Sequence, residues 1–332
     1  MIEKYVQADR FLICVQTDCV SAITFLDEKI DEFSRLTISF SAAESGEQAI
    51  RFRYEDKDEI EVSFRHKTRE LLLRCPWVRI SESTILPMMF RLMVEWLRQK
   101  DGEIKLHASG VERDGVVALF LAPSEGGKTS TAMAMCQRYG CLLRANDASV
   151  VKLVEGKPVF MRGDIAFRVR YNGLEAYSPQ MFAQKTENRR TAEPPWYNKL
   201  SLLPEDMGVV TSTGNTPVRF LFFVRLDSMI DGVKVTEYPS DAEARRKFWF
   251  KPIMMVLQNI TGTIRGSDLI PVDKSGILLP LVLPSLDTPK WSKQRAAFVN
   301  TIFSSCRVFQ LRGQLEPMAK LIHQLMTQEA QK

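Results

Sequence analysis

The sequence predicts a mixed α/β protein with two domains. Short β-rich runs between residues 11 and 80 predict a small N-terminal α+β domain that covers residues 1–101. An uninterrupted apolar run at 116–121, followed by a glycine-rich segment and a helical pattern, predicts a buried strand, a tight loop and a helix. Further apolar runs and helical patterns follow, so residues 102–332 are expected to form a larger α/β domain.

In the N-terminal domain, the expected strands form an antiparallel unit. Ser83 is the expected cap of a helix whose apolar positions recur at helical spacing from Leu86 to Leu97. Asp101-Gly102 ends this helix and marks the boundary between the domains. The expected strands cover residues 11–15, 35–40, 49–54, 59–64 and 71–80.

In the larger domain, Asp114-Gly115 is typical of a hairpin turn between two strands. The expected strands cover residues 104–111, 116–121, 141–144, 149–154, 158–161 and 218–225. One helix is expected to begin near residue 128. Further helices are expected at 241–256, 293–303 and 315–326.

Composition and charge exclude several classes of protein. The net charge of +5 is spread along the chain, so neither a nucleic acid nor an anionic membrane is an expected partner. Six cysteines without a CxxC pair are typical of reduced core residues in a cytoplasmic protein. The first nine residues lack the features of a secretory signal, and the longest apolar runs are too short to span a membrane.

The glycine-rich segment has the context of a phosphate-binding loop, because a strand precedes it and a helix follows it. Lys128 would reach the β and γ oxygens of ATP, and the Thr129 hydroxyl would bind Mg²⁺. Ala122 stands where the usual pattern begins with glycine. The residues expected to bind nucleotide are Ser124, Glu125, Gly126, Gly127, Lys128, Thr129 and Ser130.

Asp147 follows the short apolar strand expected at 141–144. A carboxylate in this place could bind the metal or accept a proton from an attacking hydroxyl. The alternative is that Asn146-Asp147 only forms the turn into the next strand, and the sequence does not separate the two interpretations.

His107 lies in the strand expected at 104–111, where a single histidine is more often a packed core residue than a catalyst. His66 and His323 have no histidine or cysteine at ligand spacing, so a zinc site is not expected. No cysteine lies in a motif that indicates a nucleophile.

Taken together, three segments resemble the HPr kinase-like family, whose members are related to HPr kinase/phosphorylase and more distantly to phosphoenolpyruvate carboxykinase. The segments are Leu106-His107-Ala108, the loop from Ala122 to Thr129, and Arg144-Ala145-Asn146-Asp147. The resemblance implies a P-loop kinase domain over residues 102–332 that transfers phosphate to a serine-type hydroxyl. It implies a catalytic role for His107, Lys128 and Asp147, and it makes a homo-oligomer plausible.

The sequence departs from the family at Asn146, where the family usually has a second aspartate. It also lacks the downstream signature of HPr kinase proper, so the resemblance implies a different hydroxyl acceptor, either a peptide or protein or a small biosynthetic metabolite. The N-terminal domain could recognise this acceptor. We therefore expect an ATP- and Mg²⁺-dependent kinase; the alternative is a nucleotide-binding regulatory or scaffold protein that transfers no phosphate.

Three further segments have two interpretations each. Residues 185–199 combine bases and aromatics, which suits either an acceptor-binding loop or an exposed surface loop. Arg168 and Arg170 alternate in an expected strand and could face phosphate or solvent. The basic and aromatic cluster at 245–251 favours a buried helix face with a basic edge over a nucleic-acid site, so a nucleic-acid-dependent ATPase ranks last.

Overall fold

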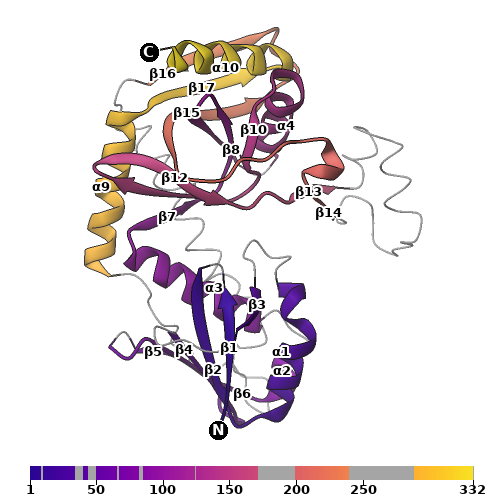
Figure 1. The fold of residues 1–332 in the computed structure, drawn as a ribbon, viewed down its shortest axis with the longest axis vertical. Helices are drawn as coiled ribbons and strands as arrows, with labels where there is room; N and C mark the ends of the chain where they lie inside the picture. Colours follow the sequence, from indigo (N-terminus) through magenta and orange to yellow (C-terminus); the bar gives the residue numbers. More distant parts are fainter. Residues whose placement is uncertain are drawn as a thin grey trace, which may run out of the picture. The chain divides into compact units, whose positions relative to one another are not determined.

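The chain divides into two units in the computed structural model (Figure 1). Unit 1 comprises Met1–Lys105 and Arg246–Asn300, and unit 2 comprises Leu106–Arg245 and Thr301–Lys332. Both contain helices and strands, which confirms the mixed α/β class. The structure describes residues 1–8, 10–33, 40–43, 50–65, 67–81, 85–123, 125–170, 199–238 and 288–331. Within these ranges, no helix is long and apolar enough to cross a membrane.

Unit 1 is built on a sheet with the strand order β3-β1-β2-β4-β6-β5. Its strands are β1 (Ile2–Ala8), β2 (Phe11–Thr17), β3 (Phe40–Ala43), β4 (Ile50–Asp56), β5 (Glu61–Arg65) and β6 (Glu70–Cys75). Its first helices are α1 (Val20–Phe33), α2 (Trp77–Ser81) and α3 (Ile85–Lys100). Because β4 pairs in parallel with both β2 and β6, the prediction of an antiparallel unit was wrong. A parallel pair needs a crossover connection, and the chain between β2 and β4 includes α1, which the sequence analysis did not predict.

The strand expected at 71–80 ends early, at Cys75, and the chain continues as helix α2. Pro76 has no N–H to donate to a neighbouring strand, so it ends the strand. The backbone N–H of Trp77 then donates to Oδ1 of Asp56 at 2.9 Å, which satisfies a donor at the start of α2. The assignment of residues 77–80 to a strand was therefore wrong.

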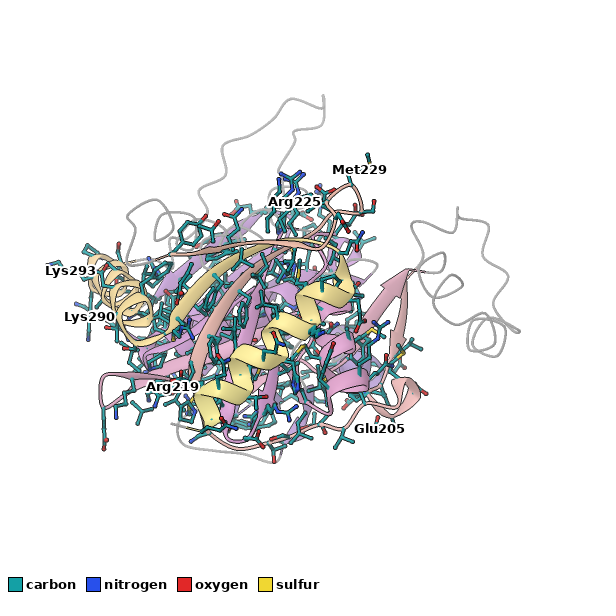
Figure 2. All side chains as sticks on the ribbon, turned by 90° about the horizontal axis from the view of Figure 1, so that it is seen from above. Glu205, Arg219, Arg225, Met229, Lys290 and Lys293 are labelled. Atoms are coloured by element: carbon teal, nitrogen blue, oxygen red, sulfur yellow. The ribbon has the colours of Figure 1, made fainter. Side chains whose placement is uncertain are left out.

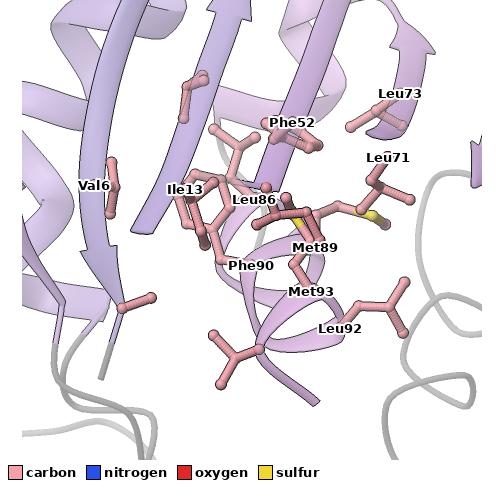
Figure 3. Packing of buried hydrophobic residues seen from close by; sticks show 14 of the residues in the cluster. Val6, Ile13, Phe52, Leu71, Leu73, Leu86, Met89, Phe90, Leu92 and Met93 are labelled. Atoms are coloured by element: carbon pink, nitrogen blue, oxygen red, sulfur yellow. The ribbon is translucent and has the colours of Figure 1, made fainter. Parts of the chain in front are cut away.

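The core of unit 1 forms where α3 packs on the sheet. Figure 3 shows Ile13 and Phe52 of the sheet facing Phe90 of α3, and the rings of Phe52 and Phe90 meet edge to face at 5.4 Å. Trp291 joins this core from α9 (Pro289–Ser305), and its ring lies 5.8 Å from that of Trp96. Unit 1 is therefore not confined to the N-terminal residues, because apolar burial places part of α9 with it.

The sheet of unit 2 branches at β15 (Thr216–Leu226), so that two arms of the sheet share this strand. One arm has the order β10-β8-β9-β15-β17-β16, and the other runs from β15 through β12 to β11. The strands are β8 (Ala108–Arg113), β9 (Val116–Leu121), β10 (Leu142–Ala145), β11 (Ser149–Val154), β12 (Lys157–Gly163), β16 (Val233–Glu237) and β17 (Arg307–Gly313). A separate ladder joins β13 (Phe167–Arg170) and β14 (Lys199–Leu202), and a short 3-10 helix, η2, spans Glu205–Met207.

Helices α4 (Lys128–Tyr139) and α10 (Leu315–Ala330) pack together in unit 2. Alternate residues of the central strands, such as Phe120, Phe222 and Leu311, share one apolar cluster with buried residues of both helices. This packing fixes α4 against β8 and β9 of the sheet.

The strand directions bring several loops to one edge of the sheet. β9, β15 and β17 are parallel, and β10 has the same direction because β8 is antiparallel to both β9 and β10. The carboxyl ends of these four strands therefore share an edge, where the chain enters β8. Ligands bind preferentially at such an edge of an α/β sheet.

Most of the elements expected in the larger domain are confirmed. Asp114 and Gly115 have φ angles of 51° and 75°, which two-residue hairpin turns require. The strand expected at 104–111 is interrupted, because His107 lies in a bend between β7 (Glu103–Leu106) and β8. Ser83, residues 35–39 of the strand expected at 35–40, and the helix expected at 241–256 lie outside the described residues, and Phe40 is the first residue of β3.

Candidate functional site

The loop between β9 and α4 is shaped by two consecutive glycines. The backbone N–H of Gly126 donates to the carbonyl of Pro123 at 3.1 Å, and Gly127 has a φ of 102°, in the region that favours glycine. A Cβ on Gly126 would lie only 2.6 Å from Cβ of Ala122. With Ala122 at the start of the loop, the close approach of the chain therefore depends on glycine at 126.

The end of β15 holds this loop in place. The backbone N–H of Leu226 donates to the carbonyl of Gly126 at 3.1 Å. A Cβ on Gly127 would overlap the side chain of Leu226. The loop and the end of β15 could therefore not approach as closely with any other residue at position 127. Figure 2 shows Arg225 near the end of β15 and Met229 in the turn that follows this strand.

The side chain of Lys128, the first residue of α4, folds back over the loop. Its Nζ donates to the carbonyls of Ala122 at 3.0 Å and Pro123 at 3.4 Å, and it lies 3.1 Å from Nε2 of His107. Only 7% of the residue is exposed. Burial lowers the pKa of the Lys128 ammonium, and the nearby Asp147 carboxylate partly opposes that effect.

His107 connects Lys128 to Asp147. Nδ1 of His107 lies 3.2 Å from the carbonyl oxygen of Asp147 and 3.3 Å from its Oδ1. A charged ammonium can only donate, so Nε2 of His107 accepts from Lys128 and the ring proton resides on Nδ1. The structure thus brings together all three residues that were predicted to be catalytic, although their chemical roles rest on the proposal below.

The carboxylate of Asp147 remains accessible, because 41% of its side chain is exposed. Its neighbour Asn146 is 2% exposed, and its Nδ2 donates to the carbonyl of Ala166 at 3.0 Å. The two residues of the predicted turn therefore differ in character: the acid is available to a ligand, and the amide is part of the interior.

The remaining predicted nucleotide-binding residues lie around the start of α4. Thr129 is half-buried, whereas Glu125 and Ser130 are exposed. Glu125 has a φ of 65°, a left-handed conformation that is uncommon for a residue with a side chain. Ser124 lies outside the described residues.

Thr129 and Asp147 supply oxygen atoms, the ligands that Mg²⁺ prefers. Within the described part of the chain, no group of three or more histidine, cysteine or acidic residues could hold a metal on its own. This donor set fits Mg²⁺, which commonly keeps several waters and shares phosphate oxygens with one or two protein ligands.

The sequence analysis missed a partly buried ion pair on the strand that leads to Asp147. Nη1 of Arg144 donates to Oε2 of Glu112 at 2.6 Å, and the same oxygen accepts from the hydroxyls of Ser212 and Thr216 at 3.0 and 3.1 Å. The guanidinium also lies 4.6 Å from the centre of the Phe160 ring. Arg144 stands between the two residues where the pairing of β10 with β8 changes register, so these contacts fix the strand that leads to Asp147.

The other predicted residues lie in a strand pair, in the core or outside the described residues. Arg168 and Arg170 are confirmed as part of a strand, where Arg168 pairs with Ser201. The segments 171–198 and 239–287, which include most of the expected acceptor loop and the cluster at 245–251, are outside the described residues. All six cysteines are free, and all except Cys19 are buried. Burial raises the pKa of Cys141 to about 11, which disfavours a thiolate.

His323, on α10, packs against the end of α4. Nη1 of Arg113 donates to Nδ1 of His323 at 2.9 Å, and the imidazole stacks on the ring of Tyr139 at 4.7 Å. Burial lowers the pKa of His323, and the positive charge of Arg113 lowers it further. This histidine joins two helices and has no contact with the three predicted catalytic residues.

Comparison with known proteins gives no assignment for this site. No protein-family model matches the sequence, and no curated protein matches it. The resemblance to the HPr kinase-like family therefore stays a hypothesis that rests on the residues of the site.

Proposed function

We propose that this protein is an ATP-dependent kinase that transfers the γ-phosphoryl group to a serine-type hydroxyl. The observation that carries the proposal is the contact of Lys128, His107 and Asp147 beside a glycine loop at the start of α4. This arrangement sets a cation and backbone N–H groups next to an accessible carboxylate, as in-line phosphoryl transfer requires.

In the proposed reaction, the acceptor hydroxyl oxygen attacks the γ-phosphorus of ATP. A new P–O bond forms, the bond to the β–γ bridging oxygen breaks, and ADP leaves with the bonding electrons. Asp147 accepts the hydroxyl proton, and Lys128 stabilises the negative charge on the phosphates. His107 orients Asp147 and Lys128. Its Nδ1 donates to Asp147, and its Nε2 accepts from Lys128.

Thr129 and Asp147 would hold the Mg²⁺ ion, which would neutralise phosphate charge when bound. The HPr kinase-like resemblance favours a peptide or protein, or a small biosynthetic metabolite, as the acceptor. A cytoplasmic location and a homo-oligomeric state belong to the same proposal.

The test is transfer from γ-labelled ATP to a panel of hydroxyl acceptors that includes free serine and serine-containing peptides. We expect label in a phosphomonoester with wild-type protein and Mg²⁺, and about 10²–10³-fold slower labelling with Lys128→Ala. Nucleotide binding without label in any acceptor would favour the regulatory or scaffold function instead. Absence of nucleotide binding would overturn both functions.

A further inference from the structure

Asn146 occupies the position at which the family resemblance leads one to expect a second acid. Its backbone N–H donates to the carbonyl of Asp164 at 2.6 Å, and its own carbonyl accepts from the Ser109 hydroxyl. Its Nδ2 donates to the carbonyl of Ala166 at 3.0 Å. One buried residue therefore connects the β10–β11 turn to β8 and to the segment between β12 and β13.

From these contacts we propose that Asn146 is a positioning residue: its amide fixes Asp147 against His107, and a carboxylate at 146 could not do so. The proposal rests on the kinase function proposed above for its catalytic consequence. The contact between Asp147 and His107, in contrast, can be tested independently of kinase activity, without added nucleotide.

The chemistry of the surroundings requires an amide at position 146. The Ala166 carbonyl can only accept a hydrogen bond, so it needs the N–H of an asparagine. Oδ1 of Asn146 is buried without a hydrogen-bond partner among the described residues. An aspartate would therefore place one oxygen against a carbonyl and the other where nothing donates to it, and an unpaired buried charge is costly.

Close packing explains how this connection can be rigid. A Cβ on Gly163 would overlap Cβ of Ala145 and would lie 2.8 Å from the carbonyl oxygen of Ala148. The backbone N–H of Asp164 donates to that same carbonyl at 2.9 Å. The end of β12 thus lies directly against the turn that contains Asn146, with no room for a larger residue at 163.

Asp147 follows Asn146 in the chain, and both its carbonyl and its Oδ1 lie near Nδ1 of His107. Any displacement of the Asn146 peptide therefore moves the two groups that meet His107. Displacements of about 1 Å in a supporting residue can lower a rate by about 10²-fold. This is why we expect Asn146 to affect the transfer step rather than nucleotide binding.

The experiment compares Asn146→Asp, Asn146→Ala and Ser109→Ala in the full chain, with Thr327→Val as the control. The Thr327 hydroxyl donates to the carbonyl of His323 within α10, so its loss should lower the melting temperature without moving His107. Each variant is assayed for kcat and for nucleotide affinity. The Nδ1–H signal of His107 is recorded by NMR on protein that contains nitrogen-isotope-labelled histidine and no nucleotide.

We expect both Asn146 variants to lower kcat by about 10²-fold, with nucleotide affinity in the absence of Mg²⁺ unchanged and the His107 signal shifted or lost. Ser109→Ala, which keeps the amide, should shift the signal less, and it serves as the test if the Asn146 variants do not fold. An Asn146→Asp protein with wild-type or higher kcat, or an unchanged His107 signal in all three variants, would overturn the proposal. If wild-type protein transfers no phosphate, the kinase function fails, while the His107 signal still decides whether Asn146 positions Asp147.

Discussion

Nζ of Lys128 lies 3.1 Å from Nε2 of His107, and the same ammonium donates to two carbonyls of the loop that precedes it. The lysine that is proposed to bind phosphate thus forms hydrogen bonds with the protein itself. Binding of a polyphosphate must exchange some of these contacts for phosphate oxygens. The stronger charge–charge attraction to phosphate favours that exchange.

Lys128→Ala should lower phosphoryl transfer by about 10²–10³-fold, because it removes a cation that stabilises transition-state charge. The fold should survive, because burial disfavours the charged form of this lysine and its removal relieves that cost. Steady-state kinetics and thermal melting measure the two effects. Lys234→Ala, at an exposed position of β16, is the matched control and should change neither. Wild-type turnover in Lys128→Ala would remove the phosphate-binding assignment.

Thr129→Ala should weaken binding of nucleotide in the presence of Mg²⁺ and have little effect in its absence, since only the metal-bound form uses the hydroxyl. Thr129→Ser keeps the hydroxyl and should restore the affinity. Calorimetric titrations with and without Mg²⁺ measure the difference. Equal affinities for the alanine and serine variants would show that the metal has other ligands.

Asp147→Asn should lower transfer by about 10²–10⁴-fold, the usual effect of losing a positioned acid–base group. The side chain is 41% exposed, so the melting temperature should change little. Asp114→Asn, in an exposed hairpin turn, controls for the loss of one negative charge. If Asp147 only forms a turn, asparagine will serve equally well, and an unchanged transfer rate would contradict the catalytic role.

The stability of the protein should fall in mild acid partly because of His323. Its pKa in the folded protein is lowered from 6.5, so protons bind more readily to the unfolded chain. The stabilising contribution is therefore complete above about pH 6.5 and is lost as the pH falls through the lower folded pKa. Urea unfolding at about pH 8 and about pH 5 should show a smaller loss of stability for His323→Gln than for the wild type. An equal loss in both proteins would contradict this role.

Local patterns predicted the elements that carry the site. The buried strand β9, the glycine loop and α4 follow one another within the segment 116–139, so their periodicity and composition are sufficient to place them. The contact of His107 with Lys128 and Asp147 joins three separate segments, and the sequence indicated it only through a family resemblance. The bend at His107 escaped prediction because its flanking residues, Leu106 and Ala108, continue an apolar pattern.

Long-range pairing was not predictable in the same way. The parallel pairing of β2 with β4 depends on how the intervening chain crosses over, and no local pattern records that. The burial of Asn146 depends on acceptors contributed by Asp164 and Ala166, so the sequence indicated only a turn or a missing acid. Pro76 was a readable signal for the end of β6, because proline cannot donate in a strand.

The pairing of Trp96 with Trp291 bears on how the chain folds during synthesis. A ribosome releases the glycine loop and α4 well before it releases Trp291, so unit 1 cannot complete its core until almost the entire chain has emerged. A nascent chain that ends near Lys105 would leave the face of Trp96 that meets Trp291 without its partner. Translation therefore starts with unit 1, but neither unit can finish folding early, because unit 2 also needs β17 and α10 from the end of the chain. A chaperone that covers exposed aromatic surface would be most useful during this interval.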